Sequence, residues 1–261
     1  MPYKNILLQK DGPIRTIVFN RPERMNSISV ETVPELLDAL QQVASDSEAR
    51  VLVFTGAGDR VFCAGADIND MVRRPAGETD HIVTIYLDYV RAIRELSIPV
   101  IAKVNGVAAG GGACTALAAD FRIASDRARF GFVFVGVGLS GADMGSSYYL
   151  PRMVGFGKAS ELLMTGEVID AAEALRIGLV NRVVPHEELD AAVDGLARRL
   201  AAGPPLALKM TKRALNASLD LGRDAEFDFE TYAQTMCLLS DDHIEGATAF
   251  KEKRAPVYHG R

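Results

Sequence analysis

Apolar and polar positions alternate along the first part of the chain in a way that predicts strands and helices in turn. Short apolar runs at Ile14–Phe19, Val51–Phe54 and Val100–Val104 predict buried strands, because turn residues bound each of them. Longer segments at Asp80–Ser97 and Gly111–Ala119 predict helices. This alternation is typical of an α/β protein in which helices cover a core of strands.

Two parts of the chain depart from this alternation. The stretch Arg73–Thr79 shows no period and predicts a mobile loop. From Ala159 onward the pattern becomes helical, and Gly203-Pro204-Pro205 predicts a boundary within it. We therefore expect a core domain over residues 1–200 and a C-terminal helical region over residues 201–261.

Composition excludes several classes of protein. The net charge is −5 and no Lys/Arg tract stands out, which disfavours nucleic-acid binding. The chain start resembles no signal peptide and no apolar stretch reaches membrane-spanning length, so we expect a cytoplasmic protein that does not bind a membrane. Three widely spaced cysteines form no CxxC pair, and we expect neither disulfides nor a metal site.

Two glycine-rich segments carry the candidate chemistry. Phe62–Ile68 and Asn105–Gly112 each follow an apolar run that reads as a strand. Turns built from small residues let a ligand oxygen approach the main chain and can aim backbone N–H groups at one point. The pair therefore predicts an oxyanion hole.

A series of motifs spread over nearly the whole chain resembles the crotonase superfamily, which is also called the enoyl-CoA hydratase/isomerase family. The motifs follow one another in the family's order: Asn20–Ser27, the two glycine segments, Asp120–Gly131, Leu150–Gly155, Leu163–Gly166, Ala171–Ala174, Gly178–Val180 and Ala249–Arg254. The resemblance implies a crotonase-like spiral of ββα units with a C-terminal helical trimerisation region. It further implies a homotrimer or a dimer of trimers that acts on acyl-CoA thioesters. No cofactor is expected, because coenzyme A is part of the substrate.

The resemblance also implies roles for particular residues. The backbone N–H groups of Ala66 and Gly111 would hold the thioester oxygen, and Gly111 is expected at a helix N-terminus whose dipole favours negative charge. Further contacts with coenzyme A or the acyl group are expected from Arg24, Met25, Ala64, Asp67, Ile68, Gly112, Phe134, Phe250 and Lys253.

At two positions the chain departs from the family's hydratases. Those enzymes carry one glutamate after the glycine turn and a second after the Phe-Gly pair, where this chain has Cys114 and Phe134. A phenyl ring carries no proton, and a thiol with its ordinary pKa of about 8.5 is a poor substitute for a carboxylate. We therefore expect the usual two-glutamate hydration to be absent. Cys114 is better explained as a buried small residue than as a nucleophile, because no histidine partner is visible.

Asp143 is the candidate acid/base. It lies between small residues in an otherwise apolar stretch, where burial would raise the pKa of its carboxyl group. The alternative is that Asp143 is a turn or cap residue, as is common before a Gly/Ser run. We expect an enoyl-CoA isomerase with Asp143 as its one base. Hydration or hydrolysis with Asp143 activating water, and a non-catalytic acyl-CoA-binding protein, stay open as alternatives.

Overall fold

Two sheets form the core of the protein, and the computed structural model describes residues 2–261 of the chain. The six-stranded sheet contains, in spatial order, β1 (Ile6–Asp11), β2 (Ile14–Phe19), β3 (Val51–Gly56), β5 (Val100–Val104), β7 (Phe121–Ser125) and β10 (Arg182–Val184). The four-stranded sheet contains β4 (Val61–Cys63), β6 (Val107–Ala109), β8 (Arg129–Gly131) and β9 (Val168–Asp170). The β1–β2 and β8–β9 pairs are antiparallel, and the other pairs are parallel.

Successive strands enter the two sheets alternately, which winds the chain into a spiral. Each of the pairs β3/β4, β5/β6 and β7/β8 gives one strand to each sheet, and the pairs follow in the same order in both. A helix or a loop then crosses over to the next turn, as parallel pairing requires. This is the spiral of ββα units that the motifs implied.

Both faces of the six-stranded sheet are covered at its central strands, which explains the apolar runs of β3 and β5. In β3, Val51 and Val53 pack under α7 (Leu189–Ala201), whereas Leu52 and Phe54 face the opposite side. Three helices cover that side: α1 (Thr32–Ser45), α2 (Ala76–Glu95) and α3 (Gly111–Ala118). The main hydrophobic core therefore lies between the sheet and α1–α3.

The remaining core elements are short. Helices α4 (Ser146–Val154), α5 (Phe156–Thr165) and α6 (Ala171–Arg176) flank α3 and the small sheet. Four 3₁₀ turns complete the core: η1 (Pro22–Arg24), η2 (Ile68–Asp70), η3 (Val133–Val137) and η4 (His186–Glu188). No helix within residues 2–261 combines the length and the apolar character that a membrane crossing needs.

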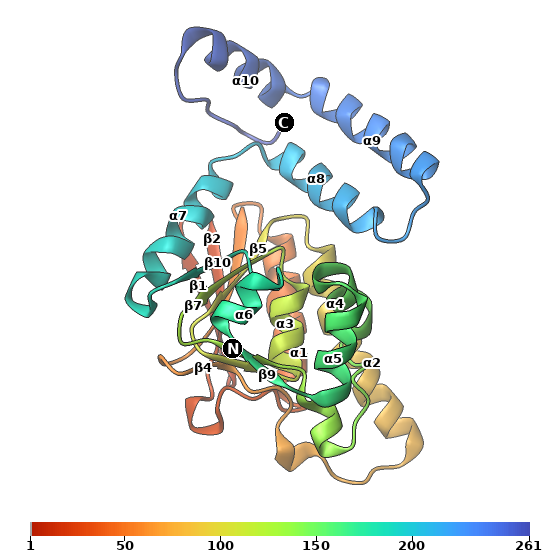
Figure 1. The fold of residues 1–261 in the computed structure, drawn as a ribbon. Helices are drawn as coiled ribbons and strands as arrows, with labels where there is room; N and C mark the ends of the chain where they lie inside the picture. The colour runs from red at the N-terminus through yellow and green to blue at the C-terminus, as the bar shows by residue number, and fades with distance from the viewer. Residues whose placement is uncertain (1) are drawn as a thin grey trace.

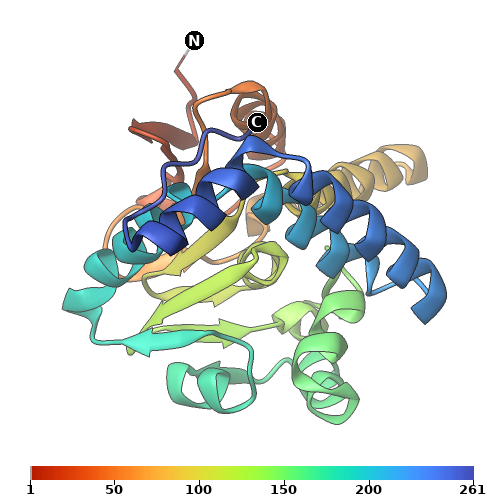
Figure 2. The same cartoon turned by 90° about the horizontal axis from the view of Figure 1, so that it is seen from above.

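Three C-terminal helices, α8 (Pro205–Ala217), α9 (Arg223–Leu238) and α10 (Asp241–Glu252), lie together at one end of the core, in blue in Figure 1. Seen from above, they extend across that end as a separate layer (Figure 2). Polar contacts of α8 hold the layer to the core. Lys212 Nζ lies 2.8 Å from the Asp120 carboxylate, and Asn216 Nδ2 donates to Arg94 O at 3.0 Å.

The sequence prediction is wrong about the extent of the loop before α2 and about the residue at which α2 begins. Helix α2 begins at Ala76, inside the stretch Arg73–Thr79 that was expected to be a loop, and four residues before the predicted start. Pro75 precedes the helix and accepts the first backbone hydrogen bond from Thr79 N, at 3.0 Å, while Arg74 and Glu78 form an ion pair of 2.9 Å across the first turn. The lack of apolar period there reflects exposure on all sides, which does not prevent a helix.

Candidate active site

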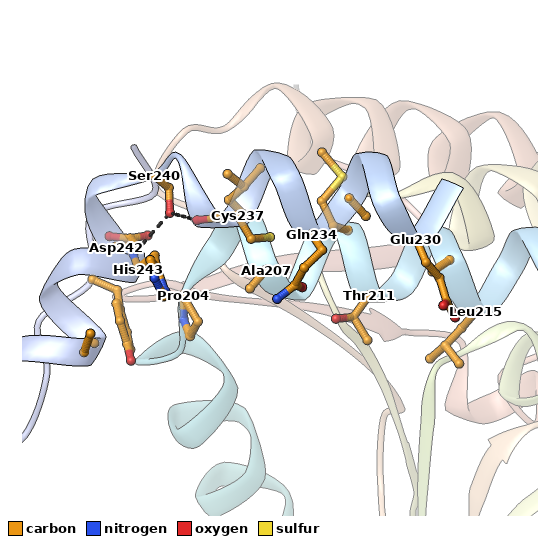
Figure 3. A pocket seen from close by; sticks show the side chains of 17 residues that line it. Pro204, Ala207, Thr211, Leu215, Glu230, Gln234, Cys237, Ser240, Asp242 and His243 are labelled. Carbon is orange, nitrogen blue, oxygen red and sulfur yellow. Dashed lines mark hydrogen bonds between the residues drawn. The ribbon is translucent and has the colours of Figure 1, made fainter. Parts of the chain in front are cut away.

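The C-terminal layer contains a cavity of about 760 Å³ between α8, α9 and the start of α10 (Figure 3). The polar groups at its end cap helices: Ser240 Oγ donates to Cys237 O at 2.7 Å and accepts from His243 N at 3.2 Å. None of the residues predicted from the sequence to form the site lines it. The candidate catalytic residues therefore lie outside this cavity.

A second cavity, of about 500 Å³, lies between the glycine segments, α2 and η3. It brings together nine of the residues predicted for the site, although they come from distant parts of the chain. These are Arg24, Met25, Ala64, Ala66, Asp67, Ile68, Gly111, Phe134 and Asp143.

Three other predicted residues do not line this cavity. Gly112 is buried, and a side chain there would collide with Cys63. The side chain of Phe250 is 86% exposed on α10, and Lys253 is the C-cap residue of the same helix. Phe250 and Lys253 thus lie at the end of α10 in the C-terminal layer, and neither lines the cavity of their own chain.

The two glycine segments touch at Gly65, where only glycine fits. Its φ is +94°, and a Cβ there would lie 2.8 Å from Ala109 O and 3.0 Å from Gly111 N. This close approach places Gly65, which precedes Ala66, directly against Gly111, the first residue of α3. Within residues 2–261, neither the Ala66 N–H nor the Gly111 N–H donates to a backbone or side-chain acceptor. Two residues whose N–H groups have no protein acceptor therefore line one cavity, and one of them begins a helix whose dipole favours an anion.

A network of hydrogen bonds fixes the Ala66 segment. Ile28 N donates to Gly65 O at 2.8 Å and Ile28 O accepts from Asp67 N at 2.9 Å, so that Ala66 is clamped on both sides. The Asp67 carboxylate pairs with Arg21 at 2.8 Å. It also accepts from Asn69 N at 3.1 Å and from Asn69 Nδ2 at 2.8 Å. These partners occupy the Asp67 carboxylate, so in this structure it holds the loop rather than offering a free charge to a ligand.

Asp143 lies in the turn before α4 and lines the same cavity. Its Oδ1 accepts from Met144 N at 2.9 Å, and its own backbone is tied to Ser146. Within the described chain no donor to Oδ2 is found. Burial raises the pKa of the Asp143 carboxyl group, and the Met144 N–H offsets only part of that shift. A partly desolvated carboxyl with one free oxygen therefore lines the same cavity as Ala66 and Gly111.

The two positions where family hydratases carry glutamate supply no acid or base here. Cys114 is fully buried in α3, and its thiol donates to Asp143 O at 3.7 Å. Burial raises the pKa of this thiol well above its ordinary value, so the group stays protonated near neutral pH. Phe134 is buried in the cavity wall, 3.9 Å from where a side chain at Gly110 would begin.

Sequence reasoning missed two residues that shape the cavity. Tyr86 lines it from α2 and donates its hydroxyl to Ile28 O at 3.0 Å. Met144 is buried at a φ of +46°, which is rare for a residue with a side chain, and its Sδ lies 3.0 Å from where a Cβ at Gly111 would be. Tyr86 is buried, and only its contact with the distant Ile28 identifies it. Met144 showed no signal apart from its place beside Asp143.

A family model described as enoyl-CoA hydratase/isomerase matches residues 9–261. The chain belongs to the enoyl-CoA hydratase/isomerase family. A crotonyl-CoA hydratase of Syntrophomonas wolfei is 41% identical, with 97% of each chain covered. A 1,2-epoxyphenylacetyl-CoA isomerase of Escherichia coli is 38% identical, with 98% of each chain covered.

The enoyl-CoA hydratase/isomerase family is also evident in solved structures. An enoyl-CoA hydratase from Bacillus anthracis superposes with a TM-score of 0.95 at 34% identity, covering 99% of this chain and all of the other. A second structure, described as a putative enoyl-CoA hydratase from Streptomyces coelicolor, has the same TM-score at 39% identity and covers 99% of this chain and 95% of the other. The predicted crotonase fold and the prediction of a family enzyme are confirmed, while the relatives' names include both hydratases and isomerases.

Proposed function

We propose that the protein is an enoyl-CoA isomerase that uses Asp143 as its single acid/base. The observation that carries this proposal is the placement of one desolvated carboxyl in the same cavity as two unpaired N–H groups, those of Ala66 and Gly111. A reaction that takes one proton from a carbon and returns it needs one base and one oxyanion site. No further acid is required.

The proposed reaction moves a double bond from carbons 3 and 4 of the acyl chain to carbons 2 and 3. The Asp143 carboxylate removes a proton from carbon 2, and negative charge develops on the thioester oxygen of the dienolate. The Ala66 and Gly111 N–H groups stabilise that oxygen, each donor contributing about 10²–10³ in rate. The protonated Asp143 then returns the proton to carbon 4. Electrons and protons balance within the substrate, so no cofactor beyond its own coenzyme A takes part.

A raised pKa suits Asp143 to this role. A carboxylate with its ordinary pKa is a weak base toward a carbon acid. Desolvation raises the pKa of the carboxyl group and so brings it closer to the pKa of the substrate's C–H group. The neighbouring walls add no competing proton donor, since Phe134 is a hydrocarbon and the Cys114 thiol stays buried. General acid–base catalysis by a positioned group typically contributes about 10²–10⁴ in rate.

Hydration is the second candidate, because several relatives are named as hydratases, among them the crotonyl-CoA hydratase. Here Asp143 would have to activate water and also supply the proton for carbon 2. Isomerisation needs only one carboxyl that takes and returns a proton, and Asp143 is the carboxyl in the cavity whose pKa burial raises. Hydrolysis of the thioester, or binding without turnover, would use the same cavity.

Binding of the coenzyme A part is proposed to begin at Arg24 and Met25, which lie exposed at the cavity. Phe250 and Lys253 lie outside the cavity of their own chain, so their proposed contact with coenzyme A requires a neighbouring protomer. We propose a homotrimer or a dimer of trimers built through the C-terminal layer. The exposed apolar residues of that layer, among them Leu215 and Leu239, support this arrangement.

The test is product analysis with a 3-enoyl-CoA and a 2-enoyl-CoA as separate substrates. We expect interconversion of the two without change of mass, detected by chromatography and mass spectrometry. A product heavier by one water would assign a hydratase, and release of free coenzyme A would assign a hydrolase. Tight binding of both thioesters without any product would leave only the acyl-CoA-binding protein.

A further inference from the structure

The walls of the cavity beyond Asp143 are apolar and reach the protein surface. The cavity is lined from α2 by Ile82 and Val83. It is also lined by Val137, the last residue of η3, and by Leu139 shortly after it. Val83, Val137 and Leu139 are 47%, 53% and 47% exposed, so the apolar wall is open to solvent at its outer end. An acyl chain placed here would not meet a closed end.

Three polar side chains that line the cavity bond to the protein itself. The Asp70 carboxylate accepts from Val30 N at 2.8 Å, and the Tyr86 hydroxyl donates to Ile28 O. The Asp67 carboxylate is paired with its arginine. Arg24 is the cationic side chain among the described residues that line the cavity, and it suits the phosphates of coenzyme A.

We propose that the enzyme selects acyl-CoAs with an unsubstituted apolar acyl chain longer than four carbons, whose distal end lies against Val83, Val137 and Leu139. This inference rests on the proposed function in placing the thioester at Ala66 and Gly111. The occupant follows from continuity, because these exposed apolar residues line the same cavity as Ala66, Gly111 and Asp143. A carboxylate or hydroxyl on the part of the chain that lies against this wall would lose some of its hydration without gaining a polar partner, so acyl groups substituted there are disfavoured.

Each fully buried methylene contributes about fourfold to affinity, from about 0.8 kcal/mol per group. The outer strip is about half exposed, so the gain per methylene must be smaller there. From butyryl-CoA to decanoyl-CoA we expect at least about a tenfold rise in affinity. The rise should level off once the chain passes the rim.

The experiment measures the dissociation constants of saturated acyl-CoAs from four to twelve carbons with the full-length protein by calorimetry. Saturated thioesters can be neither isomerised nor hydrated, so the result does not depend on which of these two reactions the enzyme performs. The test variants are Val83→Asn and Val137→Asn, which put an uncharged polar group in the strip without repelling the phosphates. Leu87→Asn and Val135→Asn are matched controls on the same two elements, since both residues are partly exposed and neither lines the cavity.

We expect Val83→Asn and Val137→Asn to reduce the affinity ratio of decanoyl-CoA to butyryl-CoA by threefold or more, and the two controls to keep the wild-type ratio. Light scattering should give the same assembly for every variant. A wild-type affinity that does not rise with chain length would overturn the proposal, as would equal effects of test and control variants. Loss of assembly in the Val83 or Val137 variants would also overturn it, because the strip would then be a protein interface. If affinity rises as expected while no enoyl-CoA is converted, the proposed function fails and the chain-length proposal stands.

Discussion

Replacing Asp143 with asparagine removes the proposed base while keeping the shape of its turn. The asparagine Oδ1 can still accept from Met144 N, which Asp143 Oδ1 does at 2.9 Å, and the backbone bonds to Ser146 are unaffected. The free oxygen becomes an amide nitrogen that cannot take a proton. We expect kcat for isomerisation to fall about 10²–10⁴-fold, the usual contribution of a general base. The Michaelis constant should change little.

The pH dependence gives a second readout of the same group. Burial raises the pKa of Asp143, so the wild-type rate should fall on acidification with a midpoint above about 3.9, the ordinary value for aspartate. The residual rate of Asp143→Asn should show no such limb. The rates are measured with a 3-enoyl-CoA across the pH range in which the protein stays folded.

At neutral pH, Asp143→Asn should lower the activity of the enzyme but raise its stability. Because folding raises the pKa of Asp143, the group's stabilising contribution is present below the ordinary aspartate pKa and is lost as the pH rises through the raised value. At neutral pH the ionised carboxylate therefore opposes folding, and Asp143→Asn should melt at a higher temperature than the wild type. The difference should disappear at acidic pH.

Asp70→Asn is the matched control, since Asp70 lines the same cavity and an asparagine can still accept from Val30 N. We expect it to change kcat less than about fivefold. An Asp143→Asn enzyme with more than a tenth of the wild-type rate would refute the reasoning. So would an Asp70→Asn enzyme that loses as much activity as the Asp143 variant.

Further predictions concern the groups around the base. Gly65→Ala should lower the free energy of unfolding by at least about 1 kcal/mol and kcat/KM about 100-fold, because its Cβ would press on Gly111 N; unchanged melting and kinetics would contradict this. Tyr86→Phe loses the hydrogen bond to Ile28 O and should lower kcat about two- to tenfold with little change in KM. A change in KM alone, measured by steady-state kinetics, would count against a positioning role for Tyr86. Cys114→Ala should keep kcat within about threefold, because burial holds the thiol protonated; a hundredfold loss would implicate the thiol in the chemistry.

The repeating part of the fold could be predicted from the sequence because its signals are local. The strands β2, β3 and β5 lie where continuous apolar runs predicted them, since both faces of their sheet are buried. The start of α2 was misplaced because its first turns are exposed and carry no apolar stripe. The strand β1 has mostly exposed or half-buried side chains, so no buried apolar run indicated it.

The site could be predicted only as far as its chemistry is carried by residue type. The glycine segments and Asp143 were found because small residues and a lone carboxyl in an apolar stretch are visible signals. The bond from Tyr86 to Ile28 joins residues 58 positions apart, and no local pattern indicates it. Asp67 lines the cavity, and no local pattern indicates its ion pair with Arg21, which holds the loop.

The most direct test of enolate chemistry at Asp143 is mass spectrometry of enoyl-, dienoyl- and saturated acyl-CoAs incubated with the protein in D₂O. We expect the wild type to incorporate deuterium into the acyl chain, with a shifted double bond in the enoyl-CoAs, and Asp143→Asn to do neither. Full incorporation by Asp143→Asn would contradict the assignment of the base. Absence of deuterium from every thioester treated with the wild-type protein would contradict enolate formation itself.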